Sequence, residues 1–215
     1  AHFGFDDAVF LANMETALGI VHDLAPRYGE TVLLVGQGVV GLLVAGILRE
    51  AGVDRIAVEP LALRREASRE LGCQVLDPAS GGVSEQVYGA TKGRGADLAV
   101  ECSGTAAGLQ LAVDCLAFEG TVIEASWFGS REVSLKLGTA FHRKRLHLRS
   151  SQVSRVASEL GGRWGKPRRF AVVLELLRRL APARYITQRF ALDRGQEAFE
   201  LLDRRASPDM KGDLN

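Results

Sequence analysis

Short apolar runs alternate along the chain with longer stretches in which apolar residues recur every three or four positions. The runs predict buried strands and the stretches predict amphipathic helices. The expected strands cover 31–35, 55–59, 73–76, 97–102, 120–125 and 145–149, with a further extended segment over 186–192. The expected helices cover 6–24, 39–50, 63–71, 83–91, 106–116, 169–180 and 195–202. This alternation is typical of α/β proteins, so we expect a doubly wound, mostly parallel six-stranded Rossmann sheet.

Three glycines follow the first expected strand at the spacing of a phosphate-binding turn. Gly36 and Gly38 lie between the strand 31–35 and the helix that begins at Val39, and Gly41 lies in the first turn of that helix. The first glycine permits a tight turn, the second lets a pyrophosphate approach the backbone, and the third allows close packing of helix and strand. The helix N-terminus adds free N–H groups and a positive dipole end. Since the glycines occur between a strand and a helix, they predict a dinucleotide site.

An acid completes this signature. Glu59 ends the second expected strand, 18 residues after Gly41. A carboxylate there accepts hydrogen bonds from adenosine ribose hydroxyls and repels a 2′-phosphate, which favours NAD. Arg64 and Arg65 follow closely and could accommodate a 2′-phosphate, so NADP is the weaker alternative. FAD proteins and class I methyltransferases share parts of the signature, and an S-adenosylmethionine-dependent methyltransferase stays open as a less favoured function.

Composition narrows the function classes. The 215 residues are 47% hydrophobic and 25% charged with a net charge of +1, which gives no electrostatic argument for binding nucleic acid or an anionic membrane. No apolar run approaches the roughly 18 residues of a membrane span. The basic cluster at 163–169 is interpreted as a solvated helix face. Cys73, Cys102 and Cys115 have no metal-site spacing and are interpreted as buried small residues, as expected in a reducing, cytoplasmic compartment.

The ordered segments 29–41, 64–72, 97–104 and 120–125 resemble the coenzyme domain of medium-chain dehydrogenases/reductases, the zinc-type alcohol and polyol dehydrogenases. The resemblance covers nearly the whole chain. It implies cofactor-binding roles for the following residues: Gly36, Gly38, Val39, Val40 and Gly41 at the pyrophosphate; Glu59 at the adenosine ribose and Arg64 at the adenine end; Cys102, Ser103 and Gly104 at the edge of the fourth strand; Ala125, Ser126 and Trp127 at the nicotinamide through backbone groups; and Thr16 facing the nicotinamide from the first helix.

The resemblance also implies a division of labour. In the family a preceding GroES-like domain supplies the zinc ligands and the proton relay, so we expect this chain to contain no catalytic residue and no metal ligand, and to be part of a longer protein. Zinc is expected only in that other domain. Residues 1–28 would be a helical lead-in, 29–152 the Rossmann domain, and 153–215 C-terminal helices and a strand that return toward the catalytic domain. Family members commonly pair the sixth strand edge to edge, which implies a homodimer through 145–152.

The expected function is hydride transfer between NAD and an alcohol or carbonyl substrate by the parent enzyme. The isolated chain is expected to bind the cofactor but to have little or no activity. The alternative is a stand-alone NAD(H)-binding module or a subunit without its own catalysis. Within the first helix, Glu15 is interpreted as an ordinary first-turn acid. A proton-relay role for His22 near Glu15 is conceivable but disfavoured. The substrate cannot be inferred, because family substrate pockets lie between the two domains.

Overall fold

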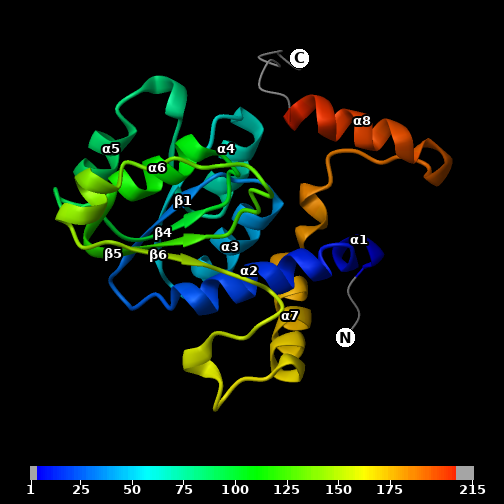
Figure 1. Cartoon of the computed structure of the whole chain (residues 1–215). Helices are drawn as coiled ribbons and strands as arrows, with labels where there is room; N and C mark the ends of the chain where they lie inside the picture. The colour runs from blue at the N-terminus through cyan, green and yellow to red at the C-terminus, as the bar shows by residue number, and fades with distance from the viewer. Residues whose placement is uncertain (1–3, 207–215) are drawn as a thin grey trace. The chain divides into compact units, whose positions relative to one another are not determined.

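The computed structural model describes residues 4–206, and within them the main architectural feature is one six-stranded, fully parallel sheet (Figure 1). Its strands are β1 (Thr31–Val35), β2 (Asp54–Val58), β3 (Gln74–Leu76), β4 (Ala96–Glu101), β5 (Leu116–Glu124) and β6 (His147–Ser150). The spatial order is β3-β2-β1-β4-β5-β6. This is the doubly wound order, so the predicted Rossmann fold is confirmed. The order reverses between β1 and β4, and ligands of such sheets bind beside the carboxyl ends of the strands at this point.

Helices cover both faces of this sheet. The α-helices of residues 4–206 are α1 (Phe5–Ala8), α2 (Leu11–Leu24), α3 (Val39–Glu50), α4 (Ala62–Glu70), α5 (Val83–Ala90), α6 (Ala106–Asp114), α7 (Lys166–Leu180) and α8 (Gly195–Ala206), of which α8 belongs to a second compact unit. α2 packs against both α3 and α7, while α6 lies against β1, β4 and β5. Val32 to Val35 are all buried, because β1 is covered on both faces. One large core cluster joins Leu33 and Val35 of β1 to Val87 of α5 and Leu109 of α6.

Several boundaries differ from the predicted ones. The predicted helix 6–24 is two helices, since the chain turns at Val9 and Phe10, where Phe10 is buried. The predicted helix 106–116 ends at Asp114, and β5 begins at Leu116 instead of Gly120. The extra strand residues pair irregularly with β4, with a register shift between Ala96 and Leu98. Such a bulge leaves residues of one strand outside the regular pairing.

The predicted strand over 186–192 is wrong for the described part of the chain. That segment has no regular structure up to residue 191, and Leu192 begins a short 3₁₀ helix. It belongs to a separate compact unit that begins at Ala183, whereas the sheet belongs to the unit that ends at Pro182. An extended segment becomes a strand only where a neighbouring strand accepts its backbone hydrogen bonds.

The interpretation of 163–169 as a solvated basic face is also wrong at one residue. Arg169 is only 2% exposed. Its guanidinium forms an ion pair with Glu15 of α2 at 2.6 Å and donates to the carbonyl oxygen of Arg155. A charge can be buried between α2 and α7 because it is paired and hydrogen-bonded. Glu15 is therefore an interhelical partner, and its interpretation as a first-turn acid is wrong, because α2 begins at Leu11 and has no acidic residue in its first turn.

Candidate cofactor site

Two of the three glycines after β1 are required by close contacts of the backbone. Gly36 has a φ of +90°, and a Cβ atom on it would lie 2.7 Å from the Cα and N atoms of Ser103. The turn after β1 therefore packs directly on the turn after β4. A Cβ atom on Gly41 would lie 2.2 Å from the carbonyl oxygen of Gly36. These contacts bring α3 close to the turn in which it originates.

Gly38, the second glycine of the turn, faces open space and makes no close backbone contact of this kind with the described part of the chain. Its φ is −68°, and a Cβ atom there would meet no atom of residues 4–206 within 4 Å. Gly38 is the N-cap of α3, and no side chain of the described residues caps this helix. Val39, Val40 and Gly41 form the first turn, where the backbone N–H groups have no partner within the helix. Open space in front of an uncapped helix N-terminus fits a phosphate group.

Glu59 lies directly after β2, beside this turn. One carboxylate oxygen accepts a hydrogen bond from the Gln37 N–H at 2.7 Å, and the other accepts one from the Leu61 N–H at 2.9 Å. The residue is 2% exposed. These bonds fix the carboxylate against the glycine turn, and each oxygen keeps a further lone pair.

The two arginines that follow Glu59 have different partners. Arg64 is partly exposed and its Nη1 lies 4.0 Å from Glu59 Oε2. Arg65 instead forms an ion pair with Asp77 at 2.8 Å and donates to the carbonyl oxygens of Glu59 and Pro60. Arg64 is therefore the cation that stands beside the Glu59 carboxylate.

Sequence reasoning missed Gln37. This side chain is fully buried, donates from Nε2 to the Gly36 carbonyl oxygen at 2.9 Å, and accepts from the Ser68 hydroxyl of α4 at 3.2 Å. It therefore connects the glycine turn with α4. The motif gave no signal for it, because the position between the first two glycines is variable in the pattern.

The turns after β4 and β5 meet at the same edge of the sheet. The Gly104 N–H donates to Ser126 Oγ at 2.9 Å. Oε1 of Glu101 accepts hydrogen bonds from the Ser103 N–H at 2.6 Å, from the Gly104 N–H at 3.0 Å and from the Ser103 hydroxyl. Glu101 is fully buried, and sequence reasoning missed it although it lies within the segment 97–104. The structure thus brings Ser103, Gly104 and Ser126 together around this carboxylate.

The other predicted site residues have varied surroundings. Ala125 continues β5 by donating its N–H to the Glu101 carbonyl oxygen at 3.0 Å. Trp127 is 92% exposed. The Thr16 hydroxyl donates to Ala12 within α2, so its own helix satisfies it. Cys102 is half-buried, whereas full burial was predicted, and burial together with Glu101 and Glu124 raises the pKa of its thiol to about 12.

His22 and Glu15, both on α2, contact different residues. The His22 ring packs edge-on against Trp164 with centroids 4.4 Å apart, and Glu15 is engaged by Arg169. Burial lowers the pKa of His22, and the Arg169 charge lowers it further. These contacts join α2 to α7 and the segment before it.

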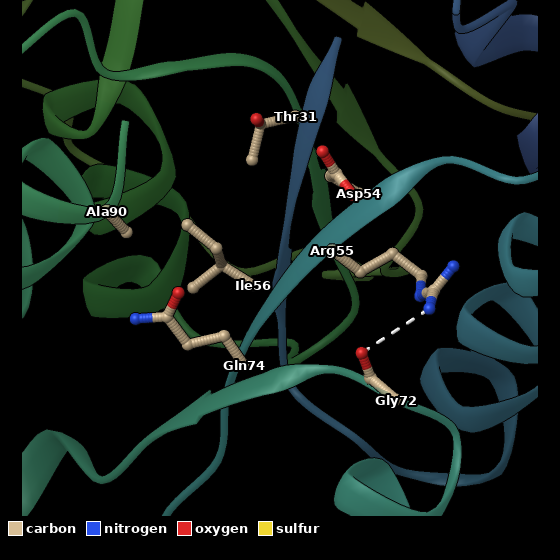
Figure 2. A pocket seen from close by; sticks show the side chains of 7 residues that line it. All are labelled: Thr31, Asp54, Arg55, Ile56, Gly72, Gln74 and Ala90. Carbon is tan, nitrogen blue, oxygen red and sulfur yellow. Dashed lines mark hydrogen bonds between the residues drawn. The ribbon is translucent and has the colours of Figure 1, made fainter. Parts of the chain in front are cut away.

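A cavity of about 250 Å³ lies at the opposite edge of the sheet (Figure 2). It is lined by Thr31, Asp54, Arg55, Ile56, Gly72, Gln74 and Ala90. Thr31, Asp54 and Gln74 are the first residues of β1, β2 and β3, whereas the glycine turn follows the last residue of β1. In Figure 2 the Arg55 guanidinium points to the Gly72 carbonyl oxygen, to which it donates at 3.4 Å. This cavity is thus separate from the site at the carboxyl ends of the strands.

No group of three or more His, Cys, Asp or Glu side chains within residues 4–206 could hold a metal ion. Within the same residues, no helix combines the length and apolar character that crossing a membrane demands.

The doubly wound sheet, with a glycine turn that opens a helix at its switch point, defines a nucleotide-binding domain of the Rossmann type. Residues 39–177 match the family model of zinc-binding dehydrogenases. This chain therefore belongs to the zinc-binding dehydrogenase family of medium-chain dehydrogenases/reductases and covers its cofactor-binding part.

Similar proteins are about twice as long. The chain is 28% identical over 173 residues to the D-guloside 3-dehydrogenase of Escherichia coli K12. The matched region covers 80% of this chain and 49% of that protein. An alcohol dehydrogenase from Escherichia coli CFT073 in complex with NADH shares the fold with a TM-score of 0.74 at 20% identity, over 93% of this chain and 56% of that one. A zinc-binding dehydrogenase from Sinorhizobium meliloti 1021 bound to NADP has a TM-score of 0.66 at 23% identity, over 80% of this chain and 49% of that one.

Proposed function

We propose that this chain is the NAD-binding domain of an oxidoreductase that transfers a hydride between the nicotinamide and an alcohol or carbonyl substrate. The observation that carries the proposal is the open space in front of Gly38 at the uncapped N-terminus of α3. A helix end of this kind attracts a pyrophosphate through its dipole and free N–H groups. Val39, Val40 and Gly41 would donate those N–H groups, while Gly36 and Gly41 keep the turn compact.

NAD is proposed over NADP because of Glu59. Its carboxylate would accept hydrogen bonds from the adenosine ribose hydroxyls, with Arg64 beside the adenine end, and a 2′-phosphate would be repelled by the buried acid. Arg64 is the feature that favours NADP, since it stands 4.0 Å from Glu59. Solved structures of this fold hold either cofactor, so the choice rests on these two side chains.

The edge formed by the turns after β4 and β5 is the proposed nicotinamide position. Cys102, Ser103 and Gly104 would line it from β4, and the backbone of Ala125, Ser126 and Trp127 would approach it from β5. Thr16 would face it from α2. A bound nicotinamide supplies the hydride chemistry, and these residues would fix which face of the ring meets the substrate. An alcohol is proposed as the substrate class because a similar protein is named a D-guloside 3-dehydrogenase.

We also propose how the parent protein is divided into domains. Residues 1–28 would lead in from a catalytic domain, 29–152 would bind the cofactor, and 153–215 would return toward that domain. A zinc ion, which as a Lewis acid would polarise the substrate oxygen, would be held by that other domain. A cytoplasmic location is proposed because all three cysteines are free.

Calorimetric titration of the chain with NADH, NADPH and S-adenosylmethionine tests this function. We expect NADH to bind most tightly, NADPH more weakly and S-adenosylmethionine not at all. Binding of S-adenosylmethionine alone would show the methyltransferase alternative to be right. NADH binding without any partner domain in the parent gene would instead support the stand-alone module.

A further inference from the structure

Two acidic residues occupy neighbouring positions at the carboxyl ends of β4 and β5. Glu101 and Glu124 are in register across the parallel pair. Residues paired in this way lie about 4.8 Å apart and point to the same face of the sheet. Glu101 accepts hydrogen bonds from Ser103 and Gly104, and the Ser126 backbone donates to Glu124, so both carboxyl groups contact residues of the proposed nicotinamide position.

Each carboxyl group has one buried oxygen without a hydrogen bond. Oε1 of Glu101 accepts three hydrogen bonds and therefore carries no proton. Oε2 of Glu101 and Oε1 of Glu124 are buried and have no hydrogen-bond partner among the described residues. Leaving two such oxygens unsatisfied is costly. One proton shared between them would satisfy both, as in other carboxyl pairs that cannot both ionise.

The electrostatics of Glu124 agree with a shared proton. Burial raises the pKa of Glu124, and the neighbouring Glu101 charge raises it further, against the opposing effect of the Ser126 backbone. With one proton the pair carries a single negative charge, and a second charge develops as the pH rises through this raised pKa.

We propose that Glu124, paired with Glu101, makes this domain favour the oxidised cofactor NAD⁺ over NADH. The nicotinamide ring is positive in NAD⁺ and neutral in NADH, so only the oxidised form is attracted by a nearby carboxylate. This inference rests on the proposed function, because it assigns a role to residues at the proposed nicotinamide position.

The preference for NAD⁺ over NADH also depends on pH, and linkage between proton binding and cofactor binding gives the direction of this dependence. NAD⁺ favours the ionised Glu124, so its binding lowers the pKa of Glu124 and releases a proton. The affinity for NAD⁺ therefore increases as the pH rises through the raised pKa of Glu124, whereas the affinity for NADH does not. We expect a relative gain of about tenfold for NAD⁺, which is within the usual range of coupling between sites.

Other ionisable groups on the packed elements have their own partners. Cys102, directly after β4, keeps its proton, since its pKa is raised to about 12. Arg131, in the loop after β5, donates to the carbonyl oxygens of Phe128 and Gly104. On the remaining neighbours, Asp23 of α2 accepts from Ser151, His22 packs on Trp164, and Arg149 of β6 pairs with Glu159. A Glu124 variant separates its titration from theirs.

Proton release on cofactor binding tests the proposal. The wild-type chain would be titrated with NAD⁺ and with NADH, from about pH 5 to about pH 9, in buffers that differ in ionisation enthalpy. We expect up to about one proton to be released per NAD⁺ bound and none per NADH. Glu124→Gln removes the charge and should abolish both the release and the pH dependence of the preference. Glu119→Gln is the control, because Glu119 is an exposed acid of β5 that pairs with Arg145.

The possible results of this titration distinguish failure of the inference from failure of the proposed function. Equal pH dependence of NAD⁺ and NADH binding in the wild-type chain overturns the inference and leaves the proposed function standing. Release that persists in a folded Glu124→Gln variant also overturns it. Failure of the wild-type chain to bind either cofactor at any pH overturns the proposed function and the inference together. Because the wild-type measurement alone can contradict the inference, the test does not depend on the variant folding.

Discussion

At the scale of single residues, the three glycines of the turn differ in what a side chain at each would meet. A methyl group at Gly36 or Gly41 would run into backbone atoms, at 2.7 Å and 2.2 Å, whereas at Gly38 it would enter open space. The same motif therefore contains two positions that matter for folding and one that matters for a ligand. This difference makes the cofactor role of the turn separable from its structural role.

Gly38→Val is expected to weaken NADH binding at least about tenfold, or roughly 1.4 kcal/mol, because the side chain occupies the phosphate space. Its melting temperature should stay close to that of the wild type. Gly41→Ala should instead lower the stability by about 1–3 kcal/mol, since a close backbone contact must relax. Calorimetry and thermal unfolding would measure the two effects. Gly89→Ala on α5, where a Cβ also meets no described atom within 4 Å, should leave NADH binding unchanged and should not lower the stability.

Glu59→Gln is expected to narrow the preference for NADH over NADPH. The amide oxygen can still accept a backbone hydrogen bond, while the charge that repels a 2′-phosphate is lost. Arg64, 4.0 Å away, would then be free to favour the phosphate. The ratio of the two dissociation constants, measured by titration, should fall by about tenfold. An unchanged ratio, equal to that of a Glu70→Gln control on the exposed side of α4, would refute the role of Glu59.

Some of these residues could be predicted from sequence and others could not. The glycines and Glu59 have fixed spacing relative to the strands, so a linear pattern identifies them. Gln37 and Glu101 act through hydrogen bonds to loops that only the folded chain brings together. Their positions are free to vary in the motif, and no periodicity distinguishes them from other buried residues. The unpartnered oxygens of Glu101 and Glu124 likewise depend on strand register, which the sequence does not specify.

At the scale of elements, periodicity predicted the six strands well and their ends less well. The polar residue Glu119 and Gly120 separate the first residues of β5 from its apolar run, which explains the late predicted start of this strand. The interpretation of 163–169 failed for a related reason. A run of basic residues looks solvated in a linear sequence, yet the packing of α7 on α2 turns Arg169 inward.

Arg169→Ala is expected to destabilise the fold by about 2–4 kcal/mol, because it leaves the Glu15 carboxylate and the Arg155 carbonyl oxygen without their buried partner. Urea unfolding would measure the loss. Arg168→Ala removes the adjacent exposed arginine, which lies over the Trp164 ring, and should cost at most about 1 kcal/mol. Arg169→Met should recover part of the stability, since it refills the volume without a buried charge. Equal losses for Arg168→Ala and Arg169→Ala would contradict this account.

At the scale of the whole molecule, β6 is an edge strand. It pairs with β5 on one side, and all four of its residues, His147 to Ser150, are exposed. An uncovered edge offers free N–H and C=O groups to another chain. We propose that two copies of this chain pair through the segment 145–152 and continue the sheet across a two-fold axis. Such an interface is self-complementary, so one substitution is present twice in it.

Leu148→Lys is expected to convert the dimer to a monomer. Leu148 is 38% exposed in the middle of β6, and a lysine there would face its own copy near the two-fold axis, where like charges repel and lysine disfavours edge pairing. Leu63→Lys is the matched control, because Leu63 is a more exposed leucine, at 69%, on α4. Light scattering after size exclusion should give a dimeric mass for the wild type and the control and a monomeric mass for Leu148→Lys. NADH affinity should be the same in all three, because β6 contributes no residue to the proposed cofactor site. A monomeric wild type would show that this edge has no partner copy in solution, while a Leu148→Lys dimer would place the interface on another surface.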